Sequence, residues 1–174
     1  KYRVAIMPLS DGAEPEIVWE GDGRFDQAFY PVWSPDGGRL AFSVWSEGGY
    51  HDLYVLDVAT REATRLTNDR ALDTVPRWAP GGRWLYYASD RNGIYNIYAM
   101  DVATREVKQV TNMLGGTQWF DVSPDGERIV WTSTRDHMDM PIGNWSDDSE
   151  YPQGAELYVS DWKGGNVQRL THNE

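Results

Sequence analysis

The chain has 174 residues, with 16 Lys and Arg against 27 Asp and Glu, so its net charge is −11, and it has no cysteine. The length fits one domain with its own core. The acidic balance argues against a nucleic-acid or anionic-membrane partner, and the lack of cysteine excludes disulfides and thiolate chemistry.

The opening segment predicts two strands, over Tyr2–Met7 and Glu16–Trp19. Because the chain starts at Lys1 rather than at Met, we expect a processed product or part of a longer chain. No apolar run reaches the 18 residues of a membrane span and no signal peptide is visible, but a removed signal would leave the same trace. Secretion therefore stays open.

The next segment predicts four short strands. The first runs over Tyr30–Ser34 and ends in a Pro-Asp-Gly turn, the second over Arg39–Trp45, the third over Asp52–Val58, and the fourth ends at Leu66-Thr67. The Gly48-Gly49 pair favours a hairpin between the second and third strands.

The same four-strand pattern then returns twice. The turn sequence Trp-Ser-Pro-Asp-Gly of the first unit recurs as Trp78-Ala79-Pro80-Gly81 in the second unit and as Val122-Ser123-Pro124-Asp125-Gly126 in the third. The Leu/Val-Thr pair returns 44 residues later at Val110-Thr111, and then 60 residues later at Leu170-Thr171. The extra length of the third unit falls in an inserted loop over residues 137–154.

The second strands of the units are apolar on both faces, as in Trp84–Tyr87 and Ile129–Trp131. Strands buried on both sides show this pattern, and repeats of about 40–45 residues with four strands each are typical of propeller blades. The sequence therefore predicts an all-β fold, a β-propeller of four-stranded antiparallel blades. The predicted division is residues 1–25 as the last two strands of a preceding blade, then blades over 26–71, 72–114 and 115–174.

About three and a half blades are thus present. Because closed rings have at least four, we expect an open piece of a ring of about six or seven blades. Such a piece exposes apolar blade faces, so we expect it to bind further blades, a protein partner or copies of itself.

The linked motifs, Trp-Ser-Pro-Asp-Gly, then Leu-Ala-Phe, Leu-Tyr-Val-x-Asp and Arg-Leu-Thr, resemble the repeat of TolB-type propellers, from about Ala28 to Thr171. The pattern departs at Gly81, which replaces the turn Asp, and at Val122, which replaces the Trp. The resemblance implies a non-enzymatic scaffold for protein–protein interaction, located in the bacterial periplasm or outside the cell. Similar repeats form the substrate-gating propellers of prolyl-oligopeptidase-type and tricorn-type peptidases, which is the alternative.

No Gly-x-Ser-x-Gly nucleophile elbow occurs, and the three histidines, His51, His137 and His172, are predicted in loops or at the chain end. We therefore expect no catalytic residues and no enzyme activity in this chain.

The inserted loop suggests a third function, a metal- or carbohydrate-binding propeller. Oxygen ligands in a flexible loop suit Ca²⁺, although a solvated acidic loop has the same composition and no EF-hand spacing is present. We expect no cofactor, with Ca²⁺ as the alternative. The candidate metal ligands are Asp136, Asp139, Asp147, Asp148 and Glu150.

Five residues are candidates for binding a ligand or partner. Asp73 and Asp121 lie at predicted first strands, nearest the axis, where ions or partner peptides can bind. The alternative is that they cap turns or pair with Arg77 and Arg91. Most rings recur at repeat positions and indicate packing between blades, and the exceptions are Trp145, Tyr151 and Trp162.

Overall fold

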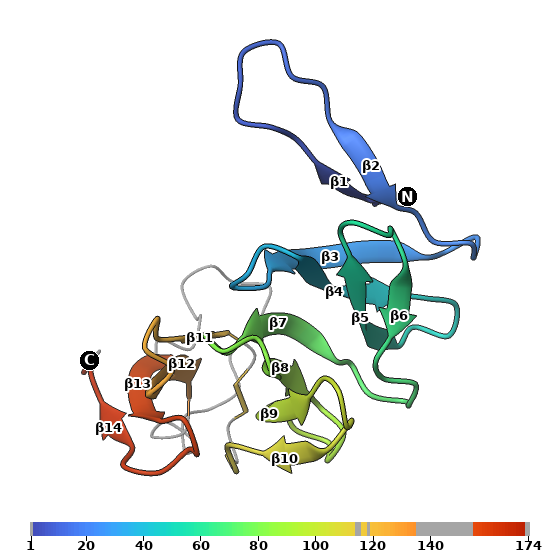
Figure 1. Ribbon diagram of the computed structural model, residues 1–174. Helices are drawn as coiled ribbons and strands as arrows, with labels where there is room; N and C mark the ends of the chain where they lie inside the picture. The colour runs from blue at the N-terminus through green and yellow to red at the C-terminus, as the bar shows by residue number, and fades with distance from the viewer. Residues whose placement is uncertain (1, 114–115, 118, 135–154, 173–174) are drawn as a thin grey trace, which may run out of the picture.

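The computed structural model describes residues 2–113, 116–117, 119–134 and 155–172, and every regular element in them is a β-strand (Figure 1). The strands form one two-stranded and three four-stranded antiparallel sheets. No helix in these ranges could span a membrane. The predicted β-propeller, with three and a half blades present, is confirmed.

The sheets follow one another along the chain. The half blade is the hairpin β1 (Val4–Ile6) and β2 (Glu16–Trp19), which extends away from the other sheets in Figure 1. Blade one consists of β3 (Gln27–Trp33), β4 (Arg39–Trp45), β5 (His51–Asp57) and β6 (Ala63–Arg65). Blade two consists of β7 (Thr74–Trp78), β8 (Trp84–Ser89), β9 (Asn96–Asp101) and β10 (Val107–Gln109). Blade three consists of β11 (Phe120–Val122), β12 (Arg128–Ser133), β13 (Glu156–Asp161) and β14 (Gln168–Arg169).

The Ser-Pro-Asp-Gly segments form the turns between first and second strands. The hydroxyl of Ser34 donates to Asp36 and accepts from the backbone N–H of Arg39 at 2.8 Å. In blade two Ala79 has no hydroxyl, yet the N–H of Gly82 still donates to its carbonyl at 2.8 Å, and Gly82 takes a φ of 66°. The backbone turn and its left-handed glycine therefore keep the shape where the side-chain bonds are missing.

The Leu/Val-Thr signature has an equally direct cause. In blade two the hydroxyl of Thr111 accepts a hydrogen bond from the N–H of Ile97 at 2.9 Å and donates to Asn96 at 3.0 Å. Thr67 and Thr171 accept from Leu53 and Leu157 in the same way, at 2.9 and 2.8 Å. Each threonine thus ties the fourth strand of its blade to the start of the third.

Aromatic side chains recur because they pair across strands two and three. Phe42 faces Tyr54, Tyr87 faces Tyr98 and Trp131 faces Tyr158, each pair stacked with ring centroids 5.9–6.0 Å apart. These rings lie in three hydrophobic clusters, one between each two successive sheets. Both faces of blades one and two are therefore buried, as the double-sided apolar pattern predicted.

The first strands are the innermost ones. The first strand of blade two, β7, contacts β3 on one side and β11 on the other, and the three lie beside one another in Figure 1. They therefore line the side of the sheets that faces the propeller axis. We call the end where β3, β7 and β11 begin the entry end, and the opposite end, with the Ser-Pro-Asp-Gly turns, the turn end.

Candidate functional site

A group of aromatic side chains lies at the entry end of the first strands. Its rings follow one another from Tyr2 to Phe29 (5.4 Å between centroids), to Tyr30 (6.2 Å) and to Trp119 (6.0 Å). Tyr2, Tyr30 and Trp119 are exposed over 62, 36 and 53% of their surface. We call Phe29, Tyr30, His51, Tyr95 and Trp119 the axial aromatic surface.

A backbone irregularity directs one of these rings. The pairing of β3 with β4 shifts register between Phe29 and Val32, and Tyr30 within this bulge has a φ of 55°. The pairing of β7 shifts in the same way, with Val75 at a φ of 51°. Positive φ is unfavourable for a residue with a Cβ, and bulges often redirect a side chain. The bulge in β3 places Tyr30 against Trp119 of blade three.

A shallow pocket of about 120 Å³ lies within this surface, lined by Phe29, Tyr30, His51, Thr74 and Tyr95. Burial raises the pKa of Tyr95 to about 12, so this phenol is neutral at physiological pH. Burial lowers the pKa of His51, although Asp52 and Asp90 oppose the shift. Near neutral pH the pocket therefore has an uncharged aromatic lining.

The prediction that His51 lies in a loop is wrong, because it begins strand β5 and is half-buried. Its Nδ1 lies 3.2 Å from the hydroxyl of Ser43, which donates its proton to the carbonyl of Asp73 at 2.8 Å. Since a serine has one proton, Nδ1 of His51 must be the donor in their contact. In this arrangement the hydroxyl proton of Ser43 is directed to the backbone carbonyl of Asp73 rather than to His51.

Asp73 lies beneath this surface and is fully buried. Arg91 donates to both of its carboxylate oxygens, at 3.0 and 3.1 Å, and also to Ser89 at 3.0 Å. Burial raises the pKa of Asp73, with Ser89 and Arg91 opposing that shift. The backbone N–H of Leu72 donates to neighbouring Asp90 at 2.7 Å. The predicted alternative for Asp73, an ion pair with Arg91, is observed.

Asp121 is the other axial carboxylate singled out from the sequence. It lies in β11, is exposed over 69% of its side chain, and contacts Nε of Arg77 in β7 at 3.3 Å. This ion pair links the first strands of blades two and three. Both carboxylates thus lie near the axis, and both pair with an arginine of blade two.

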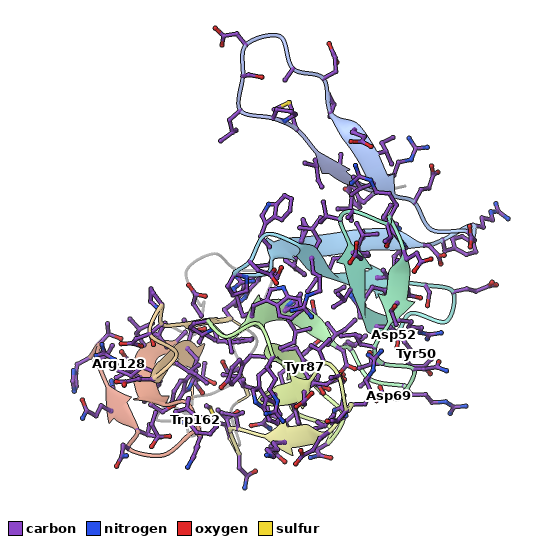
Figure 2. The ribbon with its side chains drawn as sticks, viewed as in Figure 1. Tyr50, Asp52, Asp69, Tyr87, Arg128 and Trp162 are labelled. Atoms are coloured by element: carbon purple, nitrogen blue, oxygen red, sulfur yellow. The ribbon has the colours of Figure 1, made fainter. Side chains whose placement is uncertain are left out.

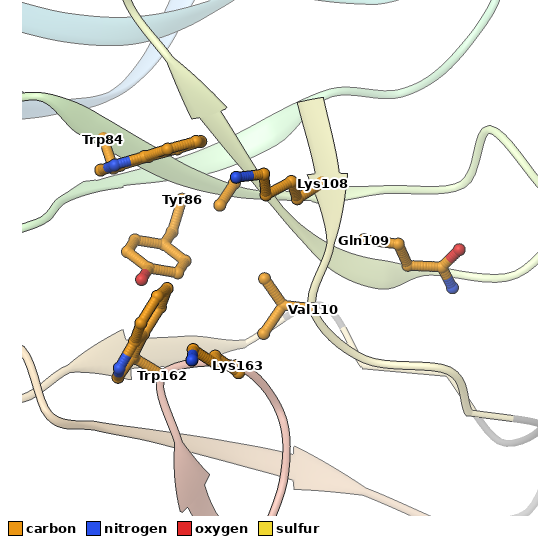
Figure 3. Close-up of a pocket in the computed structure, with 8 residues that line it drawn as sticks. Trp84, Tyr86, Lys108, Gln109, Val110, Trp162 and Lys163 are labelled. Carbon is orange, nitrogen blue, oxygen red and sulfur yellow. The ribbon is translucent and has the colours of Figure 1, made fainter. Parts of the chain in front are cut away.

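Trp162 lies elsewhere, in the turn between β13 and β14. Figure 2 shows it in blade three, far from Asp52 and Asp69 at the entry end of blade one. It lines a pocket of about 100 Å³ between blades two and three, together with Trp84, Tyr86 and Val110 (Figure 3). The structure therefore does not bring Trp162 together with Asp73 or Asp121.

The remaining candidates fall outside the described ranges. These are the metal candidates Asp136, Asp139, Asp147, Asp148 and Glu150, and the aromatic candidates Trp145 and Tyr151. Within the described ranges, no three His, Asp or Glu residues are grouped so as to hold a metal ion.

Sequence reasoning missed the axial aromatic surface. Tyr30, Val75 and Trp119 hold equivalent repeat positions, directly before Pro31, Pro76 and Phe120. Rings at repeat positions were assigned to packing between blades, and this assignment does not apply to the exposed Tyr30 and Trp119. The available signal was the alternation of residue size at this repeat position. Tyr30 and Trp119 are large, whereas Val75, which comes between them in the sequence, is small and buried.

Comparisons with known proteins agree with this architecture. A family model described as the TolB beta propeller domain matches residues 23–153. The Tol-Pal system protein TolB of Anaeromyxobacter dehalogenans is 48% identical over 56 residues, which are 32% of this chain and 13% of that protein.

Solved structures show the same likeness. TolB from Acinetobacter baumannii superposes with a TM-score of 0.74 and 28% identity, over 97% of this chain and 37% of that one. An oligogalacturonate lyase from Vibrio parahaemolyticus reaches a TM-score of 0.70 at 18% identity, over 99% of this chain and 48% of that one, and shares the fold alone. The chain therefore spans less than half the length of each of these proteins.

Proposed function

We propose, from the premise that this chain belongs to the TolB β-propeller domain family, that it is a non-enzymatic scaffold for protein–protein interaction. The proposed docking site is the axial aromatic surface. The proposed location is the periplasm, because the curated relatives are proteins of a bacterial Tol-Pal system.

The observation that supports this proposal most is the exposed contact between Tyr30 and Trp119. The two rings come from blades one and three and meet at 6.0 Å in a T-shaped arrangement. Tyrosine and tryptophan are the residues most enriched among those that dominate protein–protein binding energy. An exposed group of such rings is a typical protein-binding patch.

The strands that position these rings also suit recognition. Tyr30 lies within β3 and Trp119 directly precedes β11, and the first strands are joined by the Arg77–Asp121 ion pair. Rings fixed on packed strands lose little conformational freedom on binding, so less of the contact energy is spent on ordering.

The partner we propose is a protein of the Tol-Pal system, since the relatives take their name from that system. The absence of catalysis is proposed on chemical grounds. Ser43 directs its proton to the carbonyl of Asp73, and the carboxylate of Asp73 is paired with Arg91. These groups are engaged in holding the entry end together and are not arranged as nucleophile and base.

Calorimetric titration with the Pal homologue encoded in the same genome tests the proposal. We expect Tyr30→Ala and Trp119→Ala each to weaken binding by about 2 kcal/mol or more, the loss typical of a dominant interface residue. Trp33→Ala is the matched control, because Trp33 lies in the same strand β3, is exposed over 48% and sits at the turn end.

The possible outcomes distinguish a wrong docking site from a wrong partner. Unchanged affinity in Tyr30→Ala and Trp119→Ala, or an equal loss in Trp33→Ala, would show that the axial aromatic surface is not the docking site. If the wild-type chain does not bind Pal, the proposed partner is wrong.

A further inference from the structure

A second pocket lies on the seam between blades two and three, far from the axial aromatic surface. Figure 3 shows Trp84 and Tyr86 of β8 on one side and Trp162 of blade three on the other. Tyr86 is buried, Trp84 is half-buried and Trp162 is exposed over 45%. We call the space between Trp84, Tyr86, Val110 and Trp162 the seam pocket.

The seam pocket is preformed by a close approach of the two blades. Gly164, in the same turn as Trp162, has a φ of 80°, and a Cβ built on it would lie 1.8 Å from the carbonyl oxygen of Val110. Only glycine permits this approach. The turn is further held by Asp161, which accepts from the backbone N–H groups of Lys163 and Gly165 at 2.9 and 2.8 Å. A ligand would therefore meet an ordered pocket.

Two lysine ammonium groups lie at this pocket. The chain has a net charge of −11 and three lysines, Lys1, Lys108 and Lys163. The last two both line the pocket, with Nζ 4.7 Å from the ring centre of Trp84 and 4.8 Å from that of Trp162. Lys108 also contacts Glu106 at 3.2 Å, a pair in which both side chains are 55% exposed. Such an exposed pair is weak and exchanges readily for another carboxylate.

The size of the pocket limits what can enter it. Its volume of about 100 Å³ is below the roughly 150 Å³ of a cavity that holds benzene, and well below the roughly 300 Å³ where sites for drug-sized ligands begin. The enclosed space is therefore smaller than a sugar ring or a cofactor, and it matches one aliphatic side chain in size. Two ammonium groups at the rim then favour carboxylates beside that side chain.

We propose that the seam pocket binds an acidic peptide segment of a protein partner. One aliphatic side chain of the segment enters between Trp84 and Trp162, and its flanking carboxylates pair with Lys108 and Lys163. The site is independent of the axial aromatic surface, and its test neither requires nor excludes docking there.

Nuclear magnetic resonance of the indole N–H groups tests this proposal on the full chain. The probe is a capped five-residue peptide with a central leucine between acidic residues, and the control peptide has asparagine at the centre. Trp84→Phe and Trp162→Phe assign the two signals. We expect saturable shifts of both signals with the leucine peptide, and binding about tenfold weaker with the asparagine peptide.

Charge variants test the role of the lysines. The double variant Lys108→Glu, Lys163→Glu should weaken binding of the leucine peptide at least tenfold, while Lys108→Arg, Lys163→Arg should keep most of it. Thermal melting checks that each variant folds. If the charge reversal unfolds the chain, Trp162→Gln replaces it, and we expect the same loss because Trp162 forms one wall.

Three results would overturn the proposal. These are no saturable shift of either indole signal up to about 1 mM peptide, equal binding of the two peptides, or full binding to the charge-reversed chain. Equal binding of both peptides would mean that charge alone attracts them and that the apolar pocket selects nothing.

Discussion

The threonine that closes each repeat acts through its hydroxyl rather than through its size. Thr67, Thr111 and Thr171 each receive a backbone N–H from the third strand and reach a polar side chain at the start of that strand: Asp52, Asn96 and Glu156. The polar partner changes in length and charge, but the hydroxyl does not. This explains why the Leu/Val-Thr pair recurs in every unit, whereas the polar residue that contacts the threonine varies.

The substitution Thr111→Val tests this role. Valine fills nearly the same volume but leaves the buried N–H of Ile97 without an acceptor, which costs about 1–3 kcal/mol. We expect the free energy of unfolding in urea to fall by that amount. Thr64→Val is the control, because Thr64 is exposed in β6 and should change stability by no more than about 0.5 kcal/mol. Equal losses in the two variants would contradict the assigned role.

The buried pair of Asp73 and Arg91 gives a prediction that depends on pH. Replacing Arg91 by Met leaves the Asp73 carboxylate buried without its cation, and we expect a loss of about 3–5 kcal/mol at pH 7. Burial holds the pKa of Asp73 above its usual range, so the folded state binds this proton more tightly than the unfolded state. The deficit of Arg91→Met should therefore shrink as pH falls through the pKa of Asp73.

Chemical unfolding at pH 7 and at pH 4.5 measures this deficit. The double variant Asp73→Asn, Arg91→Met removes both charges and should recover part of the stability at pH 7. A deficit that stays constant over this range would mean that Asp73 is not the buried charge responsible.

At the scale of elements, the turns decide how closely two blades approach. Gly164 places the turn between β13 and β14 against the carbonyl of Val110, at the end of β10. Gly93 also has a positive φ, 85°, but a Cβ there would meet nothing within 4 Å. The two glycines therefore share the backbone requirement and differ only in the contact between blades.

This difference predicts unequal effects of the same change. Gly93→Ala should cost about 1 kcal/mol, the usual penalty for a Cβ at positive φ. Gly164→Ala should cost about 1–3 kcal/mol more, because the added methyl group forces the blades apart. Thermal unfolding of both variants measures the gap, and equal costs would show that the turn does not limit the approach of the blades.

The strands themselves could be predicted well from the sequence. The predicted second strand Arg39–Trp45 matches β4, and the predicted third strand Asp52–Val58 is displaced by one residue from β5. Both predictions succeed because apolar runs between turn signals depend on local chemistry. The axial aromatic surface was harder to predict, because its only sequence signal is the alternation of large and small residues at one repeat position. The bulge that directs Tyr30 has no local signature beyond the Pro31 that follows.

Side-chain pairing was predictable only in part. The Asp73–Arg91 and Asp121–Arg77 pairs match the alternative predicted from the sequence. Asp73 directly precedes β7 and Arg91 follows β8, whereas Arg77 and Asp121 lie in the first strands β7 and β11. His51 was misassigned because the sequence shows neither the exact start of β5 nor the hydroxyl of Ser43 across the strand pair. Seven of the remaining site candidates, over residues 136–151, lie outside the described ranges and stay predictions.

For the whole molecule, the repeat produces a stack of sheets that share their cores. One cluster joins the half blade to blade one, a second joins blades one and two, and a third joins blades two and three. Each four-stranded sheet is therefore stabilised by packing against its neighbours, and some surfaces are formed by residues from more than one blade. The axial aromatic surface is of this kind, because Tyr30 and Trp119 come from blades one and three.

The proposed protein partner docks at the entry end of the first strands. Hydrogen–deuterium exchange of the chain with and without the Pal homologue tests it directly. We expect slowed exchange in the peptides around Tyr30 and Trp119, with little change in the Ser-Pro-Asp-Gly turns at Ser34–Gly37 and Ser123–Gly126. Slowed exchange confined to those turns would place the partner at the opposite end and contradict the claim.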